Sequence, residues 1–213
     1  MSFAHNLGQH IPENESTTTM QWINSIDSLE RYADNFANDI RLFEYAAQRG
    51  LEVFLGKSPA EEPSFNIANW MFIACRDGAM QIYHFGKILD TLNTRLRKCP
   101  TLASHVDGNA IKQANRIFKS TFKDHEGVRH SVGHQAEVIL SPERNSPHGA
   151  MMVDCLSDRY YMTTYEGRIL GYEISVATLD NLHKTHKRIK DALTPVLEHA
   201  LSLPPGQSLA LKT

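Results

Sequence analysis

The chain has 213 residues, and its 22 Lys and Arg nearly balance 24 Asp and Glu, which gives a formal net charge of −2. This balance excludes a nucleic-acid binder held by bulk positive charge alone, although a local basic patch remains compatible with it. No apolar run approaches the roughly 18 residues of a membrane-spanning helix, and the first residues lack the basic and apolar regions of a signal peptide. The three cysteines, Cys75, Cys99 and Cys155, form no CxxC pair. We therefore expect a cytoplasmic protein with reduced thiols and no membrane contact.

Two long helices are predicted in the first half of the chain. Residues 1–18 are polar and predict a flexible N-terminal arm. Apolar residues then recur at spacings of three and four over 29–54, which predicts a helix of roughly 30 residues that Gly56 ends. The same spacing over 66–97 predicts a second helix. Gly78 lies in the apolar stripe of that helix, where we expect it to allow a close approach of another backbone.

The second half of the chain begins with shorter helices and then changes its period. Apolar spacing predicts helices over about 107–121 and 124–140. Three segments that follow are rich in β-branched and aromatic residues, which is typical of strands: 151–155, 159–165 and 168–174. Glu166-Gly167 between the last two segments is a signal for a tight hairpin turn.

The last helix completes a mainly α fold. It is expected to begin near Thr178, and Pro195 is expected to kink it or end it early. Short connections favour antiparallel neighbours. We therefore predict an antiparallel bundle of four to five helices, with a small antiparallel β-hairpin or three-stranded insertion at about 150–174. This bundle is predicted to form a single domain over residues 19–204, followed by an irregular tail over residues 205–213.

The most unusual local sequence is residues 124–137. On a helix, His130, His134 and Glu137 stand at i, i+4 and i+7 and share one face. Arg129 lies beside His130 and flanks a groove that it shares with His134. An arginine offers a planar fork to phosphate, and an imidazole exchanges protons near neutral pH, which is what metal-independent RNA cleavage needs. Two alternatives remain: a solvated helix face, and a metal site made by His130, His134 and Glu137.

A second polar cluster lies on the predicted 66–97 helix. Asp77 and His84 occupy one flank of its apolar stripe, and Arg76 and Tyr83 occupy the neighbouring flank. Polar groups beside a buried seam are often structural, for example in a salt bridge between helices. The functional interpretation is that this flank faces the helix of Arg129. In that case Asp77 would orient a histidine or an arginine, and Tyr83 or His84 would line the same cleft.

Further candidates lie on the last helix and among the thiols. The last helix is locally basic, which indicates either a solvated face, with His186 partly covering the core, or a contact with an RNA backbone through His183, Lys184, His186, Lys187, Arg188 and Lys190. Cys75 lies in an apolar stripe and is expected in the core. The common dinucleotide, P-loop, hydrolase and zinc-protease motifs are absent from the sequence, so no cofactor is expected.

The segment from Arg129 to His134 resembles the R-x(4–6)-H motif of the HEPN superfamily. His130 stands where that family places a polar residue directly after the arginine. The resemblance implies a helical bundle, a metal-independent endoribonuclease related to defence or toxin systems, and a homodimer in which paired motifs form one site. It assigns site positions only to Arg129, His130 and His134. The β insertion at about 150–174 departs from the family pattern.

Three hypotheses for function therefore stand. The first is a HEPN-like, metal-independent ribonuclease or RNA-binding domain that uses Arg129 and His134, assisted by His130. The second is a non-enzymatic helical module that binds a protein partner or another ligand. The third is a metal-dependent enzyme that uses His130, His134 and Glu137. A homodimer is expected under the first two hypotheses.

Overall fold

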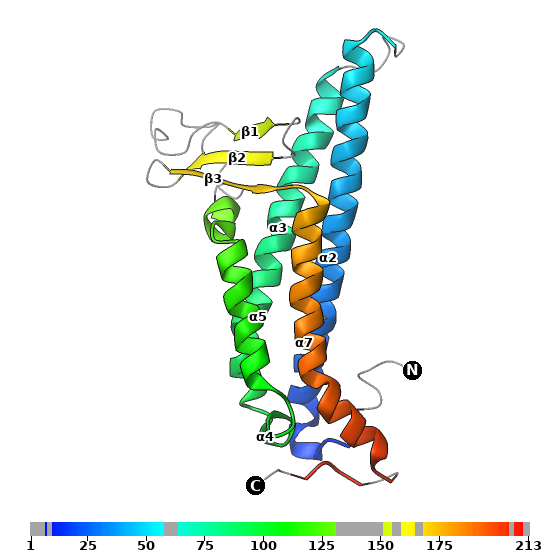
Figure 1. Cartoon of the computed structure of the whole chain (residues 1–213), viewed down its shortest axis with the longest axis vertical. Coiled ribbons are helices and arrows are strands. Elements are labelled where there is room, and N and C mark those ends of the chain that lie inside the picture. Colours follow the sequence, from blue (N-terminus) through cyan, green and yellow to red (C-terminus); the bar gives the residue numbers. More distant parts are fainter. Residues whose placement is uncertain are drawn as a thin grey trace. The chain divides into compact units, whose positions relative to one another are not determined.

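The computed structural model describes residue 7 and residues 10–57, 64–130, 151–154, 159–164, 168–204 and 207–210. These residues are mainly helical (Figure 1), which confirms the predicted fold class at that level. They divide into two compact units, which are Met1–Arg31, Phe85–Thr121 and Asn181–Thr213 (unit 1), and Tyr32–His84 and Phe122–Asp180 (unit 2). Within the described residues, no helix has an apolar stretch long enough to cross a membrane.

Helix α2 is longer than the sequence pattern predicts. It runs over Glu13–Phe54, so the predicted flexible arm is wrong for residues 13–18. Two acidic residues in its first turn, Glu13 and Glu15, favour this early start because the N-terminus of a helix carries partial positive charge. At the other end, Gly56 adopts a φ of 66°, a left-handed conformation that glycine accepts without steric cost and that ends the helix as expected.

Glu15 explains why the start of α2 is ordered. Its side chain is 6% exposed, and its carboxylate accepts hydrogen bonds from Thr101, at 3.1 Å from the backbone nitrogen and 2.8 Å from the hydroxyl. Thr101 lies in the first turn of the short helix α4, Pro100–Ala103, where backbone N–H groups have no partner within the helix. Glu15 therefore caps the start of α4 from a buried position, and the spacing of apolar residues in the sequence does not reveal this role.

The remaining helices are α3 (Ser64–Leu96), α5 (Gly108–Thr121) and α7 (Val176–Ser202). Asp107 caps α5, because its Oδ1 accepts hydrogen bonds from the backbone nitrogens of Asn109 and Ala110 at 2.9 and 3.1 Å. Helix α7 continues through Pro195 to Ser202, so this proline does not end the helix early. Figure 1 shows the axis of α7 turning in its red C-terminal part.

The core of unit 1 is built from the first half of α2, the end of α3, α5 and α7. Phe85 and Phe118 stack with ring centroids 5.5 Å apart. Trp22 is fully buried and donates a hydrogen bond of 2.9 Å from Nε1 to the Leu92 carbonyl, which satisfies its one polar atom. Other fully buried aliphatic side chains complete this core: Ile23, Leu29, Leu89, Ile111, Leu182, Ile189, Leu193 and Val196.

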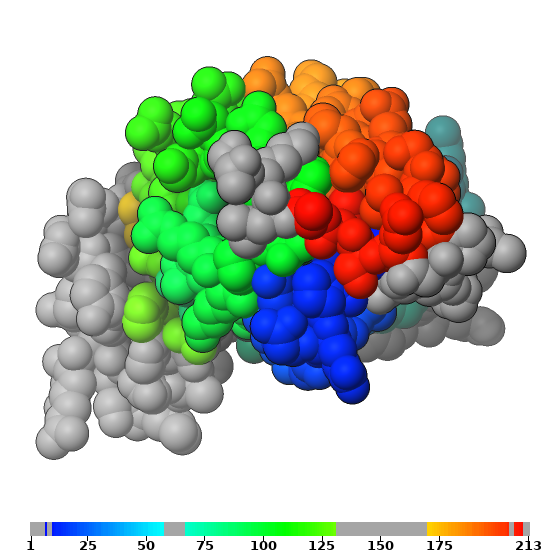
Figure 2. Space-filling model, turned by 90° about the horizontal axis from the view of Figure 1, so that it is seen from below, coloured from blue at the N-terminus to red at the C-terminus, as the bar shows by residue number. Residues whose placement is uncertain are grey.

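The C-terminal segment 207–210 belongs to unit 1 although it forms no helix or strand. His10 Nδ1 donates to the Gln207 carbonyl at 2.7 Å, and the Leu209 nitrogen donates to the His10 carbonyl at 2.6 Å. His105 Nε2 donates to the Ala210 carbonyl at 2.8 Å, and Leu209 is buried. Figure 2 shows the blue start of α2, the green stretch that contains α4 and the red C-terminal segment side by side on one face.

Unit 2 combines the second half of α2, the first part of α3 and a three-stranded antiparallel sheet in the order β1-β2-β3. The strands are β1 (Met151–Asp154), β2 (Arg159–Thr164) and β3 (Arg168–Glu173). In the register, Met151 pairs with Met162, and Tyr160 pairs with Tyr172. The expected turn at Glu166-Gly167 lies outside the described residues.

Strand β3 is anchored to α3 by one tyrosine. The Tyr172 hydroxyl donates a hydrogen bond to the Cys75 carbonyl and lies over Gly78. A Cβ atom at Gly78 would lie 2.7 Å from the Tyr172 hydroxyl and 3.1 Å from Cε2 of Phe36. The atoms nearest to Gly78 are therefore those of the Tyr172 and Phe36 side chains, which the missing Cβ allows to come close. Cys75 is fully buried, as expected.

Candidate functional site

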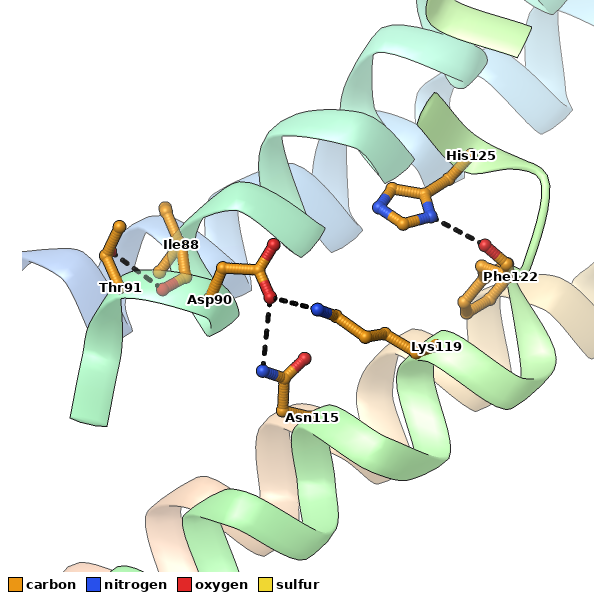
Figure 3. A network of polar contacts seen from close by, with 7 residues as sticks. All are labelled: Ile88, Asp90, Thr91, Asn115, Lys119, Phe122 and His125. Carbon is orange, nitrogen blue, oxygen red and sulfur yellow. Dashed lines mark hydrogen bonds and ion pairs between the residues drawn. The ribbon is translucent and has the colours of Figure 1, made fainter. Parts of the chain in front are cut away.

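Arg129 lies in unit 2 on a helical segment of which the structure describes residues 125–130, and the rest of the helix predicted over 124–140 lies outside the described residues. The segment is held by local contacts: the Val128 nitrogen donates to the Asp124 carbonyl at 2.9 Å, and His125 Nδ1 donates to the Phe122 carbonyl at 2.7 Å (Figure 3). Its inner face packs on β3, because Val128 is buried and a Cβ at Gly127 would clash with Cδ1 of Leu170. Glycine at position 127 therefore permits the segment to lie this close to the sheet.

The Arg129 guanidinium lies over the ring of Tyr83. Its Cζ atom is 5.2 Å from the ring centroid, which is a cation–π distance. Both side chains are half-buried, whereas the neighbouring His130 is exposed. The ring fixes the direction of the guanidinium and leaves its N–H edge as the part that can bind an anion. The structure thus places Arg129 beside one residue of the polar flank of α3.

Tyr83 belongs to a row of stacked rings. Its ring meets the ring of His84 edge-on, with centroids 5.4 Å apart. His84 stacks almost parallel on Tyr32 of α2, at 5.5 Å and an interplanar angle of 21°. Tyr32 did not emerge from the sequence, although it stands three residues after Leu29 and four before Phe36 on the apolar side of α2. These contacts orient Tyr83 and, through it, Arg129.

Asp77 belongs to a hydrogen-bond network between α2 and α3. Its Oδ2 accepts a hydrogen bond of 3.0 Å from Gln81 Nε2, and Gln81 Oε1 accepts one of 3.4 Å from Asn35 Nδ2. Asp77 is exposed and interacts with the carboxyl group of Asp39, on the facing part of α2. We expected Asp77 to orient a histidine or an arginine, but its described contacts are with a glutamine and an aspartate.

Asp39 is the buried member of this carboxyl pair. Only 6% of it is exposed, and its Oδ2 has no hydrogen-bond partner among the described residues. Burial, the negative charge of Asp77 and a hydrogen bond with Asp77 raise the pKa of Asp39 from 3.8 to about 8. At neutral pH Asp39 therefore carries a proton that it shares with Asp77. The sequence offered one signal for Asp39, because it stands three residues after Phe36 and four before Phe43 in the apolar stripe.

The other predicted site residues are placed as follows. Arg76 is at an exposed position of α3. His134 and Glu137 lie outside the described residues, so the predicted pairing of Arg129 with His134 and the alternative metal site stay predictions. Among the residues that the structure does describe, no three His, Cys, Asp or Glu side chains lie close enough to hold a metal ion.

The basic cluster on α7 lies in unit 1 and is partly neutralised. Lys187 pairs with Asp191 at 2.7 Å, and Lys190 pairs with Glu30 of α2 at 3.2 Å. His186 is buried, whereas His183, Lys184 and Arg188 are exposed. The exposed ion pairs contribute little to stability, but they reduce the positive charge that this face presents to an anion.

Another charged cluster in unit 1 joins α3 to α5. Lys119 pairs with Asp90 at 2.6 Å, and Asn115 Nδ2 donates to the same carboxylate oxygen at 3.2 Å (Figure 3). Burial alone would raise the pKa of Asp90, but these two donors outweigh burial and lower it. The Asp90 carboxylate is therefore ionised, and its bonds connect α3 to α5, which is a structural role.

In comparisons with known proteins, no family model, no curated protein and no solved structure matches the chain. What the site can do is therefore inferred from its residues. A guanidinium is fixed over an aromatic ring, an exposed imidazole follows it in the chain, and a proton-sharing carboxyl pair lies on the same two helices as the stacked rings. This set can bind a phosphate group through Arg129 and can exchange protons through imidazole.

Proposed function

We propose that the chain is a HEPN-like, metal-independent ribonuclease in which Arg129 binds the scissile phosphodiester of RNA. The observation that carries the proposal is the position of the Arg129 guanidinium over the Tyr83 ring, with His130 exposed beside it. Holding the guanidinium in one orientation lowers the entropy lost when it binds phosphate. We also propose the finer architecture that such a domain needs, an antiparallel bundle of four to five helices.

In this proposal His134 moves the proton. The ribose 2′-oxygen attacks the adjacent phosphorus as its hydroxyl proton passes to a base, and the 5′-oxygen leaves as it receives a proton. The products are a 2′,3′-cyclic phosphate and a 5′-hydroxyl, so atoms and charge balance without water or a metal. His134 serves as the base or the acid, His130 assists, and Arg129 stabilises the charge on the phosphate oxygens. Tyr83 and His84 act as positioning residues.

The test is RNA cleavage by purified protein in EDTA. We expect the wild type to cleave, and Arg129→Ala and His134→Ala to lose cleavage while keeping the helical circular dichroism signal. Arg116→Ala is the matched control, because it removes an exposed arginine from α5 in unit 1. Cleavage by both site variants at the wild-type rate would refute the proposal, as would activity that EDTA abolishes.

Binding separates the role of Arg129 from that of His134. A 2′-O-methyl RNA keeps the phosphates but cannot be cleaved. Arg129→Ala should weaken its binding by about 10- to 100-fold, because a charge-assisted hydrogen bond contributes roughly 1.5–3 kcal/mol. His134→Ala should bind it nearly as well as the wild type. Equal binding by Arg129→Ala and the wild type would show that Arg129 does not contact the phosphate.

A second candidate function is a non-enzymatic module that binds another protein or a second copy of the chain. One observation favours it: the end of α2 and the residue that follows it, in unit 2, expose large apolar side chains, with Phe54 85%, Leu51 57% and Leu55 52% exposed. Clusters of such side chains on a surface often mark contacts with other proteins. Light scattering after size-exclusion chromatography, with Phe54→Ser beside the wild type, tests it. A monomer in both cases would exclude a dimer held by this surface.

A further inference from the structure

Unit 1 contains a polar groove of about 580 Å³ between the first half of α2 and the end of α3. Its volume lies in the usual range for sites that bind small molecules. The lining is unusual for such a site because hydroxyl, amide and cationic groups dominate and one side chain is aliphatic: Thr18, Gln21, Asn24, Ser25, Ser28, Ile88, Arg95 and Lys98. Among these lining residues there are two cations and no carboxylate.

Two serines of the groove lining each accept a hydrogen bond from an arginine, and one of these arginines, Arg95, itself lines the groove. Ser25 is 7% exposed; its hydroxyl donates to the Gln21 carbonyl at 2.8 Å and accepts a hydrogen bond of 2.7 Å from Arg95 Nη1. Ser28 donates to the Asn24 carbonyl at 2.8 Å and accepts one of 3.0 Å from Arg31 Nη2. Since a guanidinium has five N–H donors, the bond to Ser25 positions Arg95 without using up its capacity to bind an anion.

The nearest acidic residues along α2 interact with a different helix. Glu30 pairs with Lys190 of α7 at 3.2 Å. Burial and the charge of Glu30 raise the pKa of Asp27, and the charge of Lys190 opposes this. Asp27 and Glu30 therefore lie toward α7, and neither lines the groove. The positive charge of Arg95 and Lys98 is left unopposed within the groove lining.

We propose that this groove binds a phosphorylated small molecule about the size of a mononucleotide. Arg95 and Lys98 would hold the phosphate, because an arginine fork and an ammonium group are the usual protein donors to phosphate oxygens. The hydroxyls and amides of α2 would bind the hydroxyl groups of the attached sugar. The inference does not depend on the proposed ribonuclease, because every residue it uses lies in unit 1 and Arg129 lies in unit 2.

Isothermal titration of the full chain with AMP, ribose 5-phosphate and adenosine tests the inference. We expect AMP and ribose 5-phosphate to bind and adenosine to bind at least tenfold more weakly. Arg95→Ala and Lys98→Ala should each weaken AMP binding about tenfold, and Ser25→Ala should weaken it less, because it only positions Arg95. Arg116→Ala, on the exposed surface of α5, is the matched control and should leave binding unchanged.

Several results would overturn the inference. They are adenosine binding as tightly as AMP, no measurable binding of AMP or ribose 5-phosphate at millimolar concentration, and equal affinity of Arg95→Ala and the wild type. Binding of an RNA oligomer that depends on Arg95, without binding of AMP, would assign the groove to nucleic acid and refute a small-molecule site. Thermal unfolding of each variant tests whether a variant with weaker binding is still folded. Arg95→Lys should bind AMP more tightly than Arg95→Ala because it keeps the charge.

Discussion

The clearest quantitative prediction concerns Asp39. Asparagine at position 39 has nearly the same shape as a protonated aspartate, and its amide can donate a hydrogen bond to Asp77 as the protonated carboxyl does. Asp39 is buried and has a pKa of about 8 in the folded protein, against 3.8 for the unpaired group. Between these two values the folded state holds one proton more than the unfolded state. Stability therefore falls as the pH rises through this window, and Asp39→Asn should remove that dependence.

The magnitude follows from the size of the pKa difference. One extra bound proton changes the free energy of unfolding by at most about 1.4 kcal/mol per pH unit. Over the full difference between the two pKa values, the stability lost has an upper limit on the order of 6 kcal/mol. Asp77 is exposed, so water screens its charge and the realised effect is smaller. We expect Asp39→Asn to raise the free energy of unfolding at pH 8 by about 2–4 kcal/mol and to change it little at pH 4.

Urea unfolding at pH 4, 6 and 8, followed by circular dichroism, measures this effect. Asp34→Asn is the matched control, because it makes the same chemical change at an exposed position of the same helix. It should leave the pH dependence of the wild type in place. Parallel pH profiles for Asp39→Asn and the wild type, or a variant that is less stable at pH 8, would refute the inference that Asp39 carries the extra proton.

Two further predictions concern packing and capping. Gly78→Ala should lower the free energy of unfolding in urea by about 1–3 kcal/mol in spite of its better helix propensity, because its Cβ would lie 2.7 Å from the Tyr172 hydroxyl. Adding Tyr172→Phe should recover part of the loss, and a Gly78→Ala variant as stable as the wild type would contradict the packing at this position. Glu15→Ala should cost about 1–3 kcal/mol, because it leaves the buried Thr101 nitrogen without an acceptor. Glu15→Gln keeps an acceptor oxygen and should cost less, and equal thermal melting of all three proteins would show that Glu15 is no cap.

The helices could be predicted because their signals are local. Apolar spacing of three and four predicts α3 and α5 to within a few residues. Gly56 predicts the end of α2, because its left-handed backbone conformation is one that glycine adopts readily. The start of α2 could not be predicted in this way. Its first turns depend on the contact between Glu15 and Thr101, which lie 86 residues apart in the chain, and spacing reports only on near neighbours.

The candidate site could be predicted only in part for the same reason. Tyr83 and Arg129 were both singled out as polar residues on helices, and the structure adds that one lies over the other. Asp39 and Tyr32 were missed because each stands among apolar residues of α2, and a sequence pattern does not show which residues of another helix face them. Partners across two helices depend on the rotation of each helix, which tertiary packing sets.

The bonds between His10 and the 207–210 segment have a consequence for how the chain folds as it is synthesised. His10 and Gln207 are 197 positions apart, so this pair forms one of the most distant contacts that a chain of this length can make. Contacts between distant residues form late, because closing a long loop costs entropy before the contact is gained. The contact of His10 therefore forms only after Gln207 has been synthesised. A premature stop before position 207 would leave His10 and His105 without their carbonyl partners, although the helices before that position could still form.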